Sequence, residues 1–158
     1  MIRIAQYRGT SWTSEIIKAV TRGPYSHTAI LLGDGRIVEA WEGSHSVREI
    51  DSLSDGHSPG TLVDIYTIPF IEKQEEVFTR YIDSQIGSGY DYWGLVAFFL
   101  NKGRWNRKNK SFCSELFYNG CIAARFYMFN PTIRGWQVSP SMITQTPFPI
   151  FHERVVTK

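Results

Sequence analysis

The sequence has little cysteine, little net charge and no long apolar run. Its 158 residues carry 17 lysine and arginine residues against 15 aspartate and glutamate residues, a formal net charge of +2. A chain so close to neutral has no general attraction for nucleic acid. The longest apolar run, residues 95–100, is far shorter than the ~20 residues that a membrane helix needs. We therefore expect no nucleic-acid partner and no membrane span, and contact with a membrane is not favoured.

The two cysteines, Cys113 and Cys121, are predicted to be free thiols. On one helix, residues eight apart lie ~12 Å from each other, whereas a disulfide needs less than ~7 Å between Cα atoms. Free thiols are typical of a reducing compartment. No pair of cysteines or histidines has the spacing of a zinc site. We therefore predict neither a metal nor any other cofactor.

The length and the N-terminal residues predict one cytoplasmic domain. A chain of 158 residues is a single domain by the usual size of domains. The N-terminal segment, residues 1–5, places an arginine among its apolar residues and lacks the pattern of a secretory signal. Composition gives no prediction of the oligomeric state.

The hydrophobic pattern places strands near both ends of the chain and helices between them. Strands are predicted at 2–7, 27–32, 36–41, 47–50, 61–68 and 150–156. Helices are predicted from Ser11 to Gly23-Pro24, with a buried stripe of Ile16, Ile17 and Val20, and at 72–86, 92–100 and 112–125. Residues 102–110 form a basic loop, and 126–149 are expected to be irregular. Without regular β-α-β alternation, this order predicts an α+β domain, residues 1–158, on a mainly antiparallel sheet.

Cys113 stands where a basic loop gives way to an apolar-periodic helix. The first turn of a helix presents free backbone N–H groups and the positive end of the helix dipole. Both favour a thiolate, which is the nucleophilic form of cysteine. The same N–H groups can hold the oxyanion of a tetrahedral intermediate. What this helix lacks locally is a base, and the best candidate is His27.

The segments 27–32 and 36–41 form the strongest hairpin pattern of the sequence, and its turn decides what faces His27. A two-residue turn sets His27 opposite Glu42 and sends Glu39 to the other face of the sheet. A three-residue loop with Gly35 in the left-handed conformation instead sets His27 opposite Trp41. Glu39 is then a diagonal neighbour of His27, ~7–8 Å away at the backbone and within reach of a long side chain.

We favour the three-residue loop, because Gly33 and Gly35 on either side of Asp34 supply the torsional freedom that it needs. Glu42 stays the alternative if the turn is tight. A nucleophile, a base and a carboxylate that orients the base form the general catalytic triad.

The remaining candidates have simpler interpretations. Cys121 lies on the apolar face of its helix and is expected to be structural. His45, His57 and His152 stand in polar or terminal segments and are expected at the surface. The basic loop 102–110 is expected to be solvated and to lie near the mouth of the site. The hydroxyl of Tyr90 is a weaker candidate as a donor to an oxyanion.

Three segments together resemble a known family. They are Tyr25-Ser26-His27 with the strand pair that follows it, Tyr90-Asp91-Tyr92, and Phe112-Cys113-Ser114-Glu115-Leu116. This combination is similar to the circularly permuted papain-like cysteine amidases and peptidases of the YaeF/YiiX kind, within the superfamily of NlpC-type peptidases. In that permuted group the histidine precedes the polar residue and the cysteine, as it does here. The similarity extends from the first helix to about residue 141.

The resemblance implies a permuted papain-like fold, with a mainly antiparallel sheet packed against the helix that carries the cysteine. It implies Cys113 as nucleophile, His27 as base and Glu39 as the residue that orients the base. The activity it implies is hydrolysis of an amide bond through a thioester, in a small peptide or an N-acyl amide, with murein-type peptides in that class. In the related lecithin–retinol acyltransferase-like enzymes a second histidine stands at the position of Glu39.

Two other functions stay open at this point. One is a lipid or ester acyltransferase, in which the apolar segment 93–100 and the basic loop meet an anionic membrane. The other is a binding module that keeps the fold without catalysis.

Overall fold

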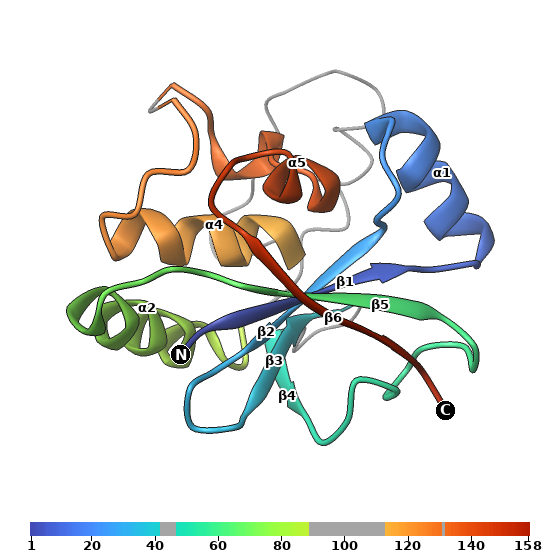
Figure 1. Ribbon diagram of the computed structural model, residues 1–158, viewed down its shortest axis with the longest axis horizontal. Helices are drawn as coiled ribbons and strands as arrows, with labels where there is room; N and C mark the ends of the chain where they lie inside the picture. The colour runs from blue at the N-terminus through green and yellow to red at the C-terminus, as the bar shows by residue number, and fades with distance from the viewer. Residues whose placement is uncertain (42–46, 89–112, 131) are drawn as a thin grey trace.

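The computed structural model describes residues 1–41, 47–88, 113–130 and 132–158 (Figure 1). These residues form six strands and four α-helices, with a short 3-10 helix at Gly135–Gln137. The strands are β1 (Arg3–Arg8), β2 (His27–Leu31), β3 (Ile37–Ala40), β4 (Val47–Ile50), β5 (Leu62–Thr67) and β6 (Ile150–Val156). The helices are α1 (Trp12–Thr21), α2 (Glu72–Gln85), α4 (Cys113–Ala123) and α5 (Pro140–Thr144).

All six strands belong to one sheet in the order β4-β3-β2-β1-β5-β6, and every neighbouring pair is antiparallel. Figure 1 shows α4 and α5 together on one side of this sheet. The prediction of an α+β domain on an antiparallel sheet is confirmed, and each predicted strand is present to within two residues at either end. The predicted helix at 92–100 lies outside the described residues.

The hairpin between β2 and β3 has the three-residue loop. Ala29 pairs with Glu39, and the backbone N–H of Leu32 donates to the carbonyl of Arg36 at 2.9 Å. Gly35 has a φ of +95°, in the left-handed region that glycine occupies without strain. This register places Glu39 on the same face of the sheet as His27, because residues an even number apart along paired strands share a face.

The sheet has an apolar cluster on each face. Ile4 and Ile30 point toward α4, whose Leu116 and Phe117 are fully buried in the same cluster. Tyr7 belongs to the second cluster on the opposite face, where Leu53 from the loop between β4 and β5 packs against it. The helix that carries the cysteine and the strand that carries the histidine are therefore held together by the main core.

The two helices α2 and α4 pack closely at a glycine. An added Cβ at Gly120 would lie 2.6 Å from Cε2 of Phe78, so only glycine allows this approach without a shift. Cys121, one residue further, is fully buried. Both cysteines are free thiols, as predicted.

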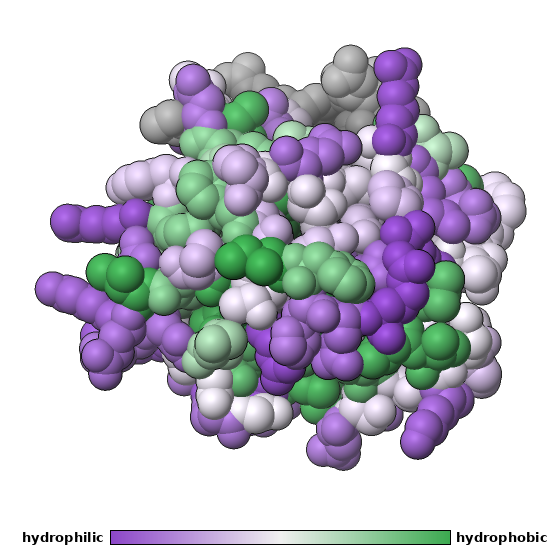
Figure 2. All heavy atoms as spheres, viewed as in Figure 1, coloured by the Kyte–Doolittle hydropathy of each residue, from purple (hydrophilic) through white to green (hydrophobic). Residues whose placement is uncertain are grey.

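A buried carboxylate attaches the edge strand β6. Asp64 on β5 is 1% exposed and accepts hydrogen bonds from Arg8, Arg154 and the hydroxyl of Tyr25. Burial would raise the pKa of Asp64, but these donors lower it to about 2. Figure 2 shows apolar side chains in the middle of the viewed face, and the exposed apolar residues of β6 include Ile150 and Phe151. Glu153 and Arg154 place charged side chains in the middle of this edge strand.

Two local predictions were wrong. The stripe of Ile16, Ile17 and Val20 is not buried, and Val20 is 46% exposed, because α1 borders a cavity instead of lying flat on the core. The segment expected to be irregular contains α5, which Ser139 caps by accepting the backbone N–H of Met142.

The predicted start of α1 is confirmed, since the side chain of Ser11 accepts the N–H of Ser14 at 3.2 Å. Within the described parts of the chain, no helix has the length and apolar character required to cross a bilayer.

Candidate active site

Cys113 is the first residue of α4 and is 8% exposed. The next residue, Ser114, donates its hydroxyl to the carbonyl of Val138 at 2.6 Å, which ties the start of the helix to the segment before α5. Because Cys113 begins α4, the positive end of the helix dipole lies close to its side chain, as the sequence predicted. This placement favours the negatively charged thiolate.

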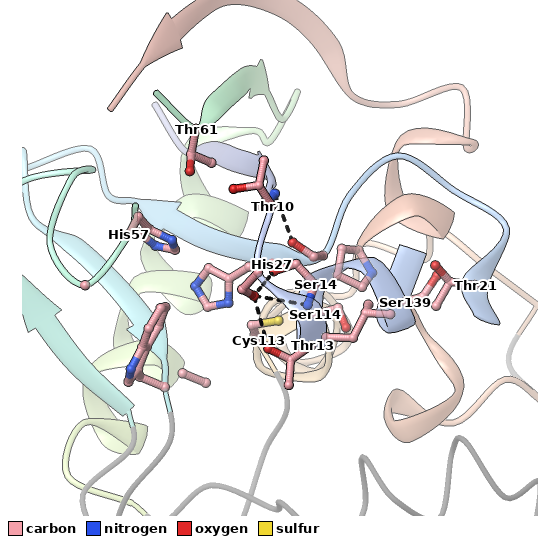
Figure 3. Close-up of a pocket in the computed structure, with 18 of the residues that line it drawn as sticks. Thr10, Thr13, Ser14, Thr21, His27, His57, Thr61, Cys113, Ser114 and Ser139 are labelled. Atoms are coloured by element: carbon pink, nitrogen blue, oxygen red, sulfur yellow. Dashed lines mark hydrogen bonds between the residues drawn. The ribbon is translucent and has the colours of Figure 1, made fainter. Parts of the chain in front are cut away.

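His27 begins β2, and its ring lies beside the sulfur of Cys113 (Figure 3). Nε2 of the ring donates to Oε2 of Glu39 at 2.9 Å. The structure thus brings together three residues that are 12 and 74 positions apart along the chain. Of the two carboxylates considered for the partner of His27, Glu39 makes the contact, and Glu42 lies outside the described residues.

Glu39 is fully buried and is held at both oxygens. Its Oε1 accepts two hydrogen bonds from Arg48 on β4, at 3.0 Å from Nε and 2.7 Å from Nη2. Arg48 in turn lies over the ring of Trp41, 5.2 Å from its centroid. A buried carboxylate with this many donors is fixed in direction, so it can fix the direction of His27 as well.

The pKa values of the three groups shift in the directions that an ion pair requires. Burial would raise the pKa of the Cys113 thiol, but the charge of His27 and the backbone N–H groups of Thr28 and Ser114 lower it overall. Burial would lower the pKa of His27, but the Cys113 thiolate and Glu39 raise it overall.

Glu39 stays ionised beside this pair. Burial would raise the pKa of its carboxyl, and the hydrogen bonds and charges of its neighbours hold that pKa well below its usual range. A resting thiolate–imidazolium pair, backed by a carboxylate, follows from these opposite shifts.

His57 was expected at the surface, and the structure shows that this was wrong. Its side chain is 7% exposed, and its Nε2 lies 3.6 Å from Oε2 of Glu39. The ring stacks on Tyr7, with centroids 3.9 Å apart, and meets the edge of Trp41 at 4.9 Å. Nothing local in the polar loop 52–60 signalled this burial, since the aromatic partners come from other strands.

A cavity of about 300 Å³ opens beside Cys113 and His27. Ten serine and threonine residues are among its lining residues, and the described lining contains no lysine, arginine, aspartate or glutamate. Figure 3 labels several of these hydroxyl groups, among them Thr10, Thr13, Ser14 and Ser139. Trp41, Trp136 and Ile17 supply apolar walls. Such a lining suits an uncharged group that both donates and accepts hydrogen bonds.

One group of possible metal ligands occurs among the described residues. The ligand atoms of His27, Glu39 and His57 lie within 4.8 Å of one another. The guanidinium of Arg48 already contacts Glu39, and a second positive charge at this point would be repelled. We therefore interpret the three residues as an electrostatic cluster in which His27 is hydrogen-bonded to Glu39 and His57 lies next to the same carboxylate.

The remaining sequence candidates separate clearly. Tyr90, His45 and the basic loop 102–110 lie outside the described residues. His152 is at the surface, with half of its side chain exposed, as predicted. Cys121 is buried, which raises the pKa of its thiol and agrees with a structural role.

A comparison with models of known protein families gave no match, and a comparison with curated protein sequences also gave none. The geometry of the site is therefore the basis for assigning a function.

Proposed function

We propose that this protein is a cysteine hydrolase that cleaves an amide bond through a thioester intermediate, with Cys113 as nucleophile, His27 as acid and base, and Glu39 orienting His27. The observation that carries the proposal is the arrangement of the three groups at one cavity. The sulfur lies beside one side of the imidazole ring, and a buried carboxylate binds the nitrogen on the other side. A structural histidine would not need both partners.

The reaction runs in two steps. The thiolate of Cys113 attacks the amide carbonyl carbon, the C–N bond breaks, and His27 gives its proton to the leaving amine nitrogen. Water then attacks the thioester carbonyl while His27 takes a proton from it, and the acid is released as the thiolate reforms. Throughout both steps Glu39 holds the ring in one orientation and favours its charged form.

The start of α4 supplies the oxyanion donor in this proposal. The backbone N–H of Cys113 lies in the first turn of α4, where none of the described residues of the helix accepts it. Loss of one oxyanion donor costs about 3–4 kcal/mol of transition-state stabilisation in other acyl-transfer enzymes. Tyr90 stays a candidate second donor.

The same order of residues supports the finer assignment of the fold as circularly permuted papain-like. The histidine strand precedes the cysteine helix in the chain, and the helix packs on the antiparallel sheet that carries the histidine. A small peptide or N-acyl amide is the proposed substrate class, and murein-type peptides belong to it. Glutamate at position 39, where the acyltransferase branch has histidine, favours the amidase over the acyltransferase.

Thiol alkylation tests the proposal without knowledge of the substrate. Iodoacetamide should label Cys113 at a pH well below ~8.5, the usual pKa of a free thiol, with the modified residue located by peptide mass spectrometry. Buried Cys121 is the control within the same molecule, and C121S should keep the reactivity of Cys113. H27A should abolish labelling at low pH. Labelling of Cys113 that follows an ordinary thiol in the wild type would refute the proposal.

Product analysis separates hydrolysis from acyl transfer. With amide substrates in the presence of an added amine or alcohol, a hydrolase releases the free acid. If mass spectrometry finds only the transferred acyl group, the acyltransferase is the correct assignment. C113S should form neither product.

A further inference from the structure

His57 is a second imidazole on the carboxylate that orients His27. Both rings direct Nε2 toward the same oxygen, Oε2 of Glu39, at 2.9 Å for His27 and 3.6 Å for His57. The centroids of the two rings are 5.3 Å apart. His57 also lines the cavity together with Cys113, as Figure 3 shows.

Nε2 of His57 is buried and makes no hydrogen bond with any residue that the structure describes. A nitrogen that faces a carboxylate carries its proton on that side, because its lone pair would be repelled by the negative oxygen. A buried donor without an acceptor destabilises the folded state. Phenylalanine would fill the same space against Tyr7 and Trp41 without this cost. Packing alone therefore gives no reason for histidine at this position.

The loop around His57 is held firmly in place. Gly56, with a φ of +75°, brings the loop so close that an added Cβ would lie 3.2 Å from Nη2 of Arg48. The carbonyl of Ser58 accepts hydrogen bonds from the hydroxyls of Thr61 and Thr157, each at 2.7 Å. The position of His57 is thus set by contacts with three separate parts of the chain.

We propose that His57 is a positioning residue that acts through Glu39: its Nε2–H competes with His27 for Oε2 and so limits how strongly the carboxylate holds the His27 proton. This inference rests on the proposed function. In the reaction His27 must both keep its proton in the resting pair and release it to the leaving amine. A second N–H group that faces Oε2 stabilises part of the negative charge of the carboxylate. This stabilisation becomes more important as His27 gives up its proton and its own attraction for Oε2 weakens. Sharing one oxygen between two imidazoles therefore eases the proton transfer.

The groups that face His57 among the described residues are few. They are the carboxylate of Glu39, the ring of His27, the guanidinium of Arg48 near the loop backbone, and the hydroxyl-bearing ring of Tyr7. Asp55, two residues before His57, acts on Tyr7 through its charge. Burial raises the pKa of Tyr7 well above its usual range, so Tyr7 stays neutral. A change of protonation caused by replacing His57 is therefore expected at Glu39, at His27 or at Cys113, which is paired with His27.

Two matched variants test the proposal. H57F keeps a stacked ring and loses the donor, whereas H57Q keeps an N–H donor and loses the ring. The His27 imidazole is followed by NMR with labelled histidine across a pH titration, and unfolding in urea is measured for each protein. We expect H57F to bind the His27 proton about threefold to tenfold more tightly, because Oε2 of Glu39 loses the N–H group that faces it at 3.6 Å. We expect H57Q to stay within about twofold of the wild type and H57F to be at least as stable.

The outcomes are distinct. If His57 acts only by packing, H57F leaves the His27 titration unchanged or moves it toward weaker proton binding, and the proposal is wrong. If H57Q shifts His27 as far as H57F does, the donor is not the cause, and the proposal is wrong as well. If the wild-type Cys113 shows no reactivity at low pH, the proposed function fails. That result comes from alkylation of Cys113, whereas the role of His57 is measured by the NMR titration of His27, so the two failures can be told apart.

Discussion

Replacing Glu39 by glutamine tests the centre of the proposed mechanism. E39Q keeps the shape of the side chain and an oxygen for His27, but it removes the negative charge that lies 2.9 Å from the ring. Two unit charges about 4 Å apart interact by about 4 kcal/mol at an effective dielectric constant near 20. Arg48 shares the same carboxylate, and the glutamine oxygen still accepts a hydrogen bond. We therefore expect the interaction that stabilises the His27 imidazolium to weaken by about 1.5–3 kcal/mol.

The sign of the effect follows from the charge. Glu39 raises the pKa of His27 because it stabilises the imidazolium. In E39Q, His27 should bind its proton about tenfold to a hundredfold more weakly, since about 1.4 kcal/mol corresponds to a factor of ten. When the pH is raised, the imidazolium of E39Q should therefore lose its proton, and the thiolate–imidazolium pair should be lost, at a lower pH than in the wild type.

NMR titration of His27 and thiolate absorbance measure the two members of the pair separately. E49Q is the matched control, because Glu49 on β4 is an exposed carboxylate paired with Arg36. A folded E39Q protein whose His27 titrates as in the wild type would refute the assignment of Glu39, and with it the triad.

Two further predictions test the framework of the fold. D64N should lower the free energy of unfolding by about 1–2 kcal/mol at neutral pH, because Arg8 and Arg154 lose a buried charged acceptor. The Asp64 pKa is lowered in the folded state, so its contribution is present above about pH 4 and is lost as pH falls toward about 2. Denaturation curves should therefore show wild type and D64N converging in acid, and a constant difference would contradict the assignment. G120A should destabilise the protein, because the clash of the new Cβ with Phe78 costs about 1–3 kcal/mol. This cost outweighs the ~1 kcal/mol by which a helix prefers alanine to glycine. A G120A protein that resists urea better than the wild type would refute the close packing of α2 against α4.

The sequence predicted those parts of the site that depend on local geometry. The Gly33-Asp34-Gly35 turn set the hairpin register, and with it the contact between His27 and Glu39. The change from basic loop to apolar period marked the start of the helix at Cys113. Each of these signals lies within a few residues of the feature that it predicts.

The parts that failed depend on contacts between distant segments. His57 stands in a polar loop, and only its packing against Tyr7 and Trp41 makes it a buried residue. Likewise, the apolar stripe of α1 was expected to face a core, but Ile17 faces the cavity instead. Periodicity shows which residues share a side of a helix but not what lies opposite them.

The loop between β2 and β3 has a consequence for how such a site can arise or be lost. Because side chains alternate along a strand, a slip of one residue in the pairing of β3 with β2 would turn every side chain of β3 to the other side. With the two-residue turn, Ala40 would pair with Ala29 in place of Glu39, and Glu39 would leave His27. A mutation around Asp34 that changes this pairing, although it lies at the far end of the hairpin from His27, would abolish the contact between His27 and Glu39 while the sheet still forms.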